Sequence, residues 1–141
     1  MKVLNCMTKK PVTLKEKYTV LSAVKEIEEH DCSFLPVVDD NHNIQGIVTN
    51  RDIIVKAITK DKDLSKMPIT DIMSKNVICC EEEDSLQQAI SQMSRHNIRR
   101  ILVKNNTGEL SGILSIIDVI NKVKDSSLLV ELLKVFSSKN I

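Results

Sequence analysis

The chain has 141 residues, of which 42% are hydrophobic and 28% charged, so it is large enough to fold as a globular protein without disulfides or metal. Twenty basic and 19 acidic residues leave a net charge of +1, which offers no general attraction to nucleic acid or to an anionic membrane. Any anion-binding site must therefore be local.

The N-terminal stretch MKVLNCMTKKPV lacks the long apolar run and cleavage site of a signal peptide, and no stretch reaches the length of a membrane span. We therefore expect a cytoplasmic protein. The four cysteines form no CxxC pair, which predicts reduced and mostly buried thiols. A zinc site would require Cys79, Cys80 and a histidine to converge, and their spacing matches known zinc sites poorly, so we expect no metal.

The first predicted elements are a helix, a hairpin and a second helix. The helix is amphipathic, because apolar residues recur at helical spacing at Val20, Ala23, Val24 and Ile27. The apolar runs FLPVV (34–38) and IQGIV (44–48), separated by the polar DDNHN, predict a β-hairpin. A second helix is expected at about 50–60. The charged segment KDKDLSKMP (60–68) then predicts an exposed linker.

After the linker the same elements return. Shifting the sequence against itself by 66 positions aligns identical residues without a gap, from Met7 with Met73 to Lys56 with Lys122. The second copy carries a helix around Leu86 to Met93, a hairpin from RILV (100–103) and LSGIL (110–114), and a helix at 116–123. We therefore expect an α+β fold in which neither repeat buries both faces of its hairpin without the other.

The repeats predict the domain boundaries. Residues 1–59 form the first repeat, 60–68 the linker, 69–124 the second repeat and 125–141 a C-terminal helix. Asp125 and Ser126 are candidate N-caps of that helix, and one side is expected to carry Leu128, Leu129, Leu132, Leu133 and Phe136. This helix either closes the core or contributes to a dimer, and periodicity alone does not separate the two.

A short motif follows the second strand of each hairpin. It reads Gly46-Ile-Val-Thr49-Asn-Arg51-Asp52 in the first copy and Gly112-Ile-Leu-Ser115-Ile-Ile-Asp118 in the second. In the local interpretation, Thr49 and Ser115 are N-caps, and the aspartate three positions later completes an acidic capping box. Such a cap stabilises a helix by about 1 kcal/mol.

The same motif suits a nucleotide. We expect the glycine to remove a side chain, so that a ligand can approach the backbone at the helix start. Unpaired N–H groups and the helix dipole favour phosphate there. A hydroxyl can donate to a phosphate or ribose oxygen, and a carboxylate can accept two hydrogen bonds from a ribose diol.

The order and duplication of these motifs resemble the cystathionine-beta-synthase (CBS) domain family. The resemblance rests on the strand-to-helix motif, on the openings Met7-Thr-Lys-Lys-Pro-Val12-Thr13 and Met73-Ser-Lys-Asn-Val-Ile78-Cys79, and on the Phe34-Leu-Pro-Val-Val-Asp39 strand. It covers nearly everything from residue 3 to residue 124.

The resemblance implies a Bateman module. Two βαββα-type repeats would pair through their sheets about a pseudo-two-fold axis, with helices outside, and the module would form a homodimer. Relatives of this kind bind AMP, ADP, ATP or S-adenosylmethionine and relay its presence to another protein. By position, Thr49, Asp52, Ser115 and Asp118 would hold ribose and phosphate in the inter-repeat cleft. The strands near Val12-Thr13 and Ile78-Cys79 would enclose the adenine.

Basic residues make the two copies unequal. Arg99 and Arg100 stand where similar proteins place a phosphate-contacting residue, and their counterparts are Ser33 and Phe34. The first copy instead has Arg51 inside its motif. We therefore expect at most one site to bind a charged nucleotide tightly, the one with Ser115, Asp118 and the arginine pair, unless these arginines are only solvated surface groups.

Three alternatives to a ligand sensor are a scaffold, an enzyme and a nucleic-acid-binding protein. A ligand-free scaffold would use the same motifs only as helix caps and the paired repeats for dimerisation. Catalysis is not expected, because the sequence has no GxxxxGK[ST], HExxH or GxSxG motif and nothing near the aspartates suggests a nucleophile. A nucleic-acid partner is disfavoured by the even charge and the three aromatic residues, which provide no stacking platform.

Overall fold

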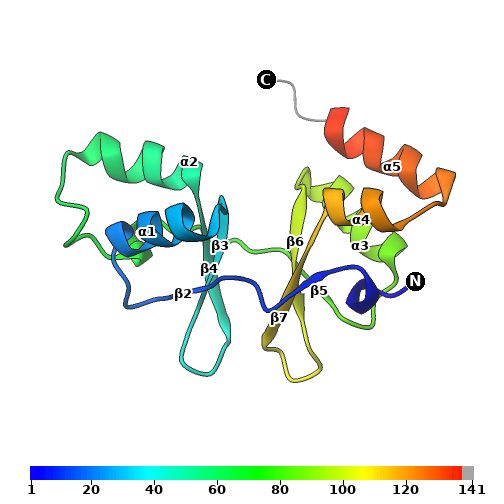
Figure 1. Cartoon of the computed structure of the whole chain (residues 1–141), viewed down its shortest axis with the longest axis horizontal. Helices are drawn as coiled ribbons and strands as arrows, with labels where there is room; N and C mark the ends of the chain where they lie inside the picture. The colour runs from blue at the N-terminus through cyan, green and yellow to red at the C-terminus, as the bar shows by residue number, and fades with distance from the viewer. Residues whose placement is uncertain (138–141) are drawn as a thin grey trace. The chain divides into compact units, whose positions relative to one another are not determined.

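A computed structural model of the chain describes residues 1–137, which fall into two compact units (Figure 1). One unit, here called unit 1, combines Met1–Lys10 with the chain from Ile78 onward, and unit 2 is Pro11–Val77. The units do not coincide with the sequence repeats, because the first ten residues join the unit that contains the second hairpin. The repeat boundaries at 59/60 and 68/69 stay a prediction about the sequence.

Unit 2 is built on a three-stranded sheet in the order β2 (Leu14–Lys15), β3 (Phe34–Val38) and β4 (Ile44–Thr49). Strands β3 and β4 are antiparallel, which confirms the first predicted hairpin, and β2 is parallel to β3. Helix α1 (Val20–His30) joins β2 to β3 and begins where the Thr19 hydroxyl accepts a hydrogen bond from the Ser22 N–H at 3.2 Å.

The second helix of unit 2 changes its hydrogen-bond pattern along its length. It starts as α2 (Asn50–Asp52), continues as a π-helix (Ile53–Ala57) and ends as a 3₁₀ turn (Ile58–Lys60). The core of the unit lies between these helices and one face of the sheet, with Val20 and Ala23 from α1 facing Leu35, Val37 and Val48. The alternation of buried residues along β4 follows the two-residue period of a strand.

Unit 1 repeats this arrangement with an additional strand. Its sheet has the order β1 (Thr8–Lys9), β7 (Leu110–Ser115), β6 (Arg100–Lys104) and β5 (Cys79–Glu81). Strands β6 and β7 form the second predicted hairpin, and β5 is parallel to β6. Helix α3 (Leu86–His96) begins at a Ser85–Gln88 capping box, and α4 (Ile116–Lys122) follows β7 directly.

Each unit takes its opening segment from the start of the other repeat. In unit 1, Thr8 lies opposite Ile113 on the outer edge of β7. In unit 2, the residue 66 positions later, Ser74, forms the equivalent antiparallel bridge with Ile47 on β4, with both N···O distances at 2.9 Å. A 3₁₀ turn precedes both bridges, at Val3–Asn5 and Ile69–Asp71. The two repeats therefore exchange equivalent segments.

The C-terminal helix α5 (Ser126–Ser137) packs along α3 and closes the core of unit 1. Leu132 and Val135 are buried, but Leu133 is 65% exposed, so its predicted place on the apolar side is wrong. Leu133 lies one residue beyond Leu132, about 100° further around the helix, and points away from α3. The side chain of Phe136 and residues 138–141 lie outside the described part of the chain. Among the described residues, no helix is both long and apolar enough to cross a membrane.

Candidate functional site

The first corner of interest lies where β4 leads into α2 in unit 2. The Thr49 hydroxyl accepts a hydrogen bond from the Asp52 N–H at 3.3 Å. In return, Asp52 Oδ2 accepts hydrogen bonds from the Thr49 N–H at 2.9 Å and from the Thr49 hydroxyl at 3.1 Å. The local interpretation of this motif as a capping box is therefore confirmed for the first copy. Arg51 is exposed on the same turn.

A lysine connects this corner to the exchanged segment. Lys56 Nζ lies 3.0 Å from Asp52 Oδ1 and also donates to the carbonyl oxygen of Ile72 at 3.2 Å. Ile72 ends the 3₁₀ turn that precedes the Ser74 bridge. The Asp52 carboxylate, whose side chain is only 13% exposed, therefore has both oxygens engaged.

The second corner lies where β7 leads into α4 in unit 1. The Ser115 hydroxyl accepts from the Asp118 N–H at 3.0 Å, and Asp118 Oδ2 accepts from the Ser115 N–H at 3.0 Å, which completes a second capping box. Lys122 Nζ donates to the carbonyl oxygen of Cys6 at 3.0 Å. Lys122 and Cys6 stand 66 positions from Lys56 and Ile72, so the lysine tether is duplicated.

The two carboxylates nevertheless differ. Asp118 has no ion pair within the part of the chain that the structure describes, whereas Asp52 is paired with Lys56. Among the described residues, the Ser115 hydroxyl only accepts from the Asp118 N–H, whereas the Thr49 hydroxyl also donates to Asp52. The second corner therefore keeps one carboxylate oxygen and one hydroxyl hydrogen for a ligand. A ligand that binds the first corner would have to displace the Lys56 ion pair or the Thr49 hydroxyl from Asp52.

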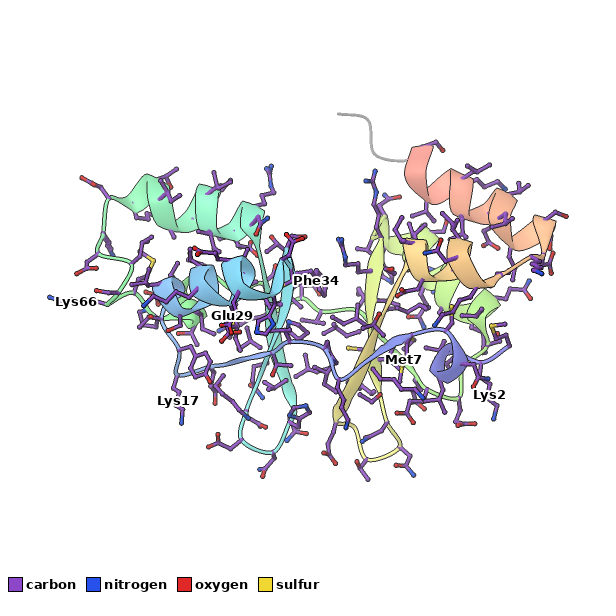
Figure 2. The ribbon with its side chains drawn as sticks, in the orientation of Figure 1. Lys2, Met7, Lys17, Glu29, Phe34 and Lys66 are labelled. Carbon is purple, nitrogen blue, oxygen red and sulfur yellow. The ribbon has the colours of Figure 1, made fainter. Side chains whose placement is uncertain are left out.

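The predicted arginine pair lies beside the second corner. Arg100, the first residue of β6, is the cross-strand partner of Ser115, and the carbonyl oxygen of Arg99 accepts from the Ile116 N–H at 3.0 Å. Both arginine side chains are exposed. In the first copy, the equivalent partner of Thr49 is Phe34, which Figure 2 shows on β3. Unit 1 therefore places Arg100 across from the Ser115 hydroxyl and the Asp118 carboxylate that caps the same turn, and binds the backbone of Arg99 to that turn.

The four residues predicted to enclose the adenine differ in burial and in whether they lie within a strand. Val12 and Ile78 pack against the cores of their own units, and Thr13 is half-buried just before β2. Only Cys79 lies within a strand, as the partner of Leu102 in the β5–β6 ladder. Cross-strand partners in register lie on the same face of a sheet, and so do residues two apart on one strand. Cys79 pairs with Leu102, which is two residues from Arg100, so Cys79 lies on the face that carries Arg100 and Ser115.

The glycine of each motif has a role other than the predicted one. A Cβ atom at Gly46 would lie 2.7 Å from the Ser74 carbonyl oxygen, and one at Gly112 would lie 2.8 Å from that of Thr8. The glycines therefore admit the exchanged backbone segment. The expectation that they open the backbone to a ligand is wrong, because the chain itself fills that space. Met7, labelled in Figure 2, and Met73 complete the contact.

The four cysteines are free thiols, and burial raises the pKa of each. The effect is largest at Cys80, where burial and nearby acidic groups raise the pKa to about 12. In residues 1–137, one group of three potential metal ligands lies within mutual reach, namely Glu26, Glu29 and His30 on the surface of α1. That group contains neither Cys79 nor Cys80.

The sequence interpretation assigned no role to Lys56 and Lys122. Both tethers use a backbone carbonyl, which no motif search detects. The sequence feature that could have pointed to these two lysines is that they are identical when the chain is aligned with itself at a shift of 66 residues. Within that alignment they are the last identical pair, four positions after the motif aspartates.

Comparisons with known proteins agree on one family. A family model described as "CBS domain" matches twice, at residues 3–58 and 69–125. An uncharacterized 17.7 kDa protein of Acidianus ambivalens is 32% identical over 124 residues, which are 88% of this chain and 74% of that protein. An inosine-5'-monophosphate dehydrogenase of Methanocaldococcus jannaschii is 32% identical over 113 residues, 80% of this chain. The chain spans only 22% of that enzyme.

A solved structure resembles the whole tandem. It is the CBS domain pair of protein MJ0100 in complex with 5'-methylthioadenosine and S-adenosyl-L-methionine. The identity is 28% and the TM-score 0.74, and the match covers 86% of this chain and 94% of that chain.

Proposed function

This chain belongs to the CBS domain family and carries two copies of the domain, and on this premise we propose that it is a regulatory module that senses an adenosine-containing ligand. The observation that carries the proposal is the grouping of Arg99, Arg100, Ser115 and Asp118 within unit 1. A hydroxyl and a carboxylate suit a ribose, and guanidinium groups suit a phosphate. The module carries out no chemistry itself.

The ligand class follows from two independent arguments. The CBS pair of MJ0100, 28% identical to this chain, binds two compounds that share an adenosine moiety. At the second corner, the arginine pair adds positive charge where the ligand group beyond the ribose would lie. Positive charge favours the phosphates of AMP, ADP or ATP over the cationic sulfonium of S-adenosylmethionine. The ligand is therefore an adenine nucleotide, with S-adenosylmethionine as the second candidate.

One corner binds more tightly than the other. Asp52 is already paired with Lys56 and bonded twice by Thr49, so a ribose must compete with these contacts. Asp118 has a carboxylate oxygen without such a partner among the described residues. We assign the tighter site to the second corner. Arg51 gives the first corner one positive charge, against two from Arg99 and Arg100 at the second.

A ligand-free scaffold is the second candidate, and the closed capping boxes favour it. All four side chains of the two motifs bond their own backbone, as helix caps alone require. In this alternative the module is a homodimer that holds a partner protein without a small molecule. Substitution of either aspartate would then change stability and leave the partner interaction intact.

Thermal unfolding with AMP, ADP, ATP and S-adenosylmethionine in turn tests the proposal. A ligand that binds the folded state raises Tm in proportion to the logarithm of its concentration above Kd. We expect a rise with at least one adenine nucleotide, and we expect Asp118→Ala to abolish it while Asp52→Ala retains most of it. If none of the four compounds raises Tm, the scaffold replaces the sensor.

A further inference from the structure

The exchanged segment of unit 1, Val3–Thr8, belongs to the core of that unit. The side chains of Val3 and Cys6 are fully buried, and the Val3 N–H donates to the carbonyl oxygen of Asp84 at 2.9 Å, just before α3. Val3 and Cys6 lie in the same apolar cluster as Val119 of α4. The segment is therefore packed in the unit whose helix α4 carries the second corner.

Helix α4 binds Cys6 at two points that are one helical turn apart. The Cys6 thiol donates to the carbonyl oxygen of Asp118 at 3.5 Å, and Lys122 Nζ donates to the carbonyl oxygen of Cys6 at 3.0 Å. Positions four apart lie on the same side of a helix, so the two contacts together fix the rotation of α4 about its axis. Because α4 carries the Asp118 carboxylate, the same contacts set the direction in which that carboxylate points.

The first corner uses its lysine differently. Lys56 Nζ contacts the carbonyl oxygen of Ile72 at 3.2 Å and Asp52 Oδ1 at 3.0 Å. Ile72 stands at the position of Cys6 and has no side-chain donor for the helix. In the described part of unit 1, by contrast, Lys122 contacts the exchanged segment and forms no ion pair with the motif aspartate. The second corner therefore combines a doubly held helix with a carboxylate that a ligand can reach.

The exchanged segment leaves unit 1 through a residue in a costly conformation. Lys10 has a φ of +51°, in the left-handed region, and Pro11 after it begins unit 2. The residue 66 positions later, Asn76, is not in that region, although asparagine tolerates it better than lysine. A residue other than glycine keeps such a conformation only where the surrounding contacts hold it there. Opening of the segment relieves this cost, so we expect the segment to open more readily than the β6–β7 hairpin.

We propose that the exchanged segment Val3–Thr8 and the second corner are energetically coupled through α4, with Cys6 and Lys122 as positioning residues for Asp118. This coupling rests on the proposed function, because it concerns the regulation of that ligand site. The docked segment holds Asp118 in place for the ribose. The bound ligand in return holds the segment against opening, because coupling between two equilibria is reciprocal. The chain that enters unit 2 at Pro11 is therefore restrained when the ligand is bound.

Amide hydrogen exchange of the intact protein, with and without ligand, tests the coupling. The ligand is the one of AMP, ADP, ATP and S-adenosylmethionine that raises Tm most. A segment whose opening weakens ligand binding gains protection at saturation, by the factor in which the docked and open forms differ in affinity. We expect residues 3–8 to exchange at least about fivefold more slowly with ligand, and residues 69–74, the equivalent segment of unit 2, to slow by less than about twofold.

Variants of two lysines separate positioning from stability. Lys122→Met is expected to raise the Kd of the ligand about two- to fivefold and to remove the additional protection of residues 3–8. A purely structural role would lower Tm and leave Kd unchanged. Lys122→Arg keeps a donor and the charge and is expected to retain the native Kd and protection. Lys124→Met removes the same charge from an exposed position and is expected to change neither.

The outcomes distinguish this coupling from the sensor on which it rests. If the ligand binds and residues 3–8 gain no more protection than residues 69–74, or if Lys122→Met leaves Kd unchanged, the coupling is wrong and the sensor stands. If none of the four compounds raises Tm, the sensor fails and the coupling fails with it.

Discussion

Arg100 lies directly opposite Ser115 across the β6–β7 ladder, at the end of the hairpin where α4 begins. Antiparallel partners share one face of a sheet, so both residues lie on the face that also carries Cys79. The equivalent pair in unit 2 is Phe34 and Thr49. Thr49 has a hydroxyl, as Ser115 does, but Phe34 has no positive charge. This exchange of arginine for phenylalanine is the main chemical difference between the two corners.

The exchanged segments lead to a prediction about the glycines. Gly112→Ala places a Cβ 2.8 Å from the Thr8 carbonyl oxygen and 2.6 Å from Met7 Sδ, so β1 must shift. We expect Gly112→Ala and Gly46→Ala each to lower the free energy of unfolding by about 1–3 kcal/mol, measured by urea denaturation.

Gly108→Asn is the matched control for these variants. Gly108 has a φ of +84° and open space around its Cβ position, and asparagine tolerates the left-handed region. A loss of stability in the control equal to that in Gly112→Ala would mean that backbone freedom, and not the close approach of Thr8, explains the glycine.

The lysine tethers lead to a second prediction. Lys122→Met removes the donor to the Cys6 carbonyl oxygen, and Lys56→Met removes the donor to that of Ile72. Each loss is expected to cost about 1 kcal/mol and to speed amide hydrogen exchange in the adjoining exchanged segment. Exchange at residues 3–8 reports on Lys122, and exchange at residues 69–74 reports on Lys56.

The outcome is specific to each tether. Lys122→Met is expected to leave residues 69–74 unchanged. Lys124 is exposed and forms no such tether within residues 1–137, so Lys124→Met is expected to leave both segments unchanged. If all three variants speed exchange in both segments alike, the tethers have no local role.

The cysteines provide a test by pH. Burial raises the pKa of the Cys80 thiol to about 12, above the ordinary value of 9.0 that applies in the unfolded chain. Folding therefore favours the protonated thiol. This contribution to stability is complete below pH 9 and is lost as the pH rises from 9 towards 12. In urea unfolding at pH 7 and pH 10, we expect Cys80→Ala to show a smaller loss of stability with pH than the native chain, and an equal loss would contradict the assignment.

Much of the fold could be predicted from the sequence, because the signals are local. Both hairpins follow from short apolar runs around a polar turn, and both motifs are caps because a hydroxyl and an aspartate three positions apart suit a helix start. The exchange of opening segments could not be predicted. It pairs Thr8 with Ile113, which are more than a hundred positions apart. No sequence pattern around either residue indicates which strand it pairs with.

The candidate site was predicted in its parts. The sequence interpretation placed Arg99, Arg100, Ser115 and Asp118 in one site by resemblance. β-Strand register places Arg100 opposite Ser115, and the capping box joins Ser115 to Asp118. The interpretation predicted that the motif glycines let a ligand approach the backbone. The sequence shows only that a side chain is missing there, and not that another segment of the chain fills the space. The interpretation favoured the second copy because of the arginine pair alone. The Lys56–Asp52 ion pair, which engages the first aspartate, depends on side-chain geometry that spacing does not specify.

The most direct measurement is isothermal titration of AMP into the native chain, Asp118→Asn and Asp52→Asn. Asparagine keeps an acceptor oxygen for the capping box and removes the charge, so the substitution separates the helix cap from ligand binding. We predict one tight site, with affinity reduced at least about tenfold by Asp118→Asn and little changed by Asp52→Asn. Binding that both variants leave intact, or that depends on Asp52 instead, would contradict the assignment of the ligand to the second corner.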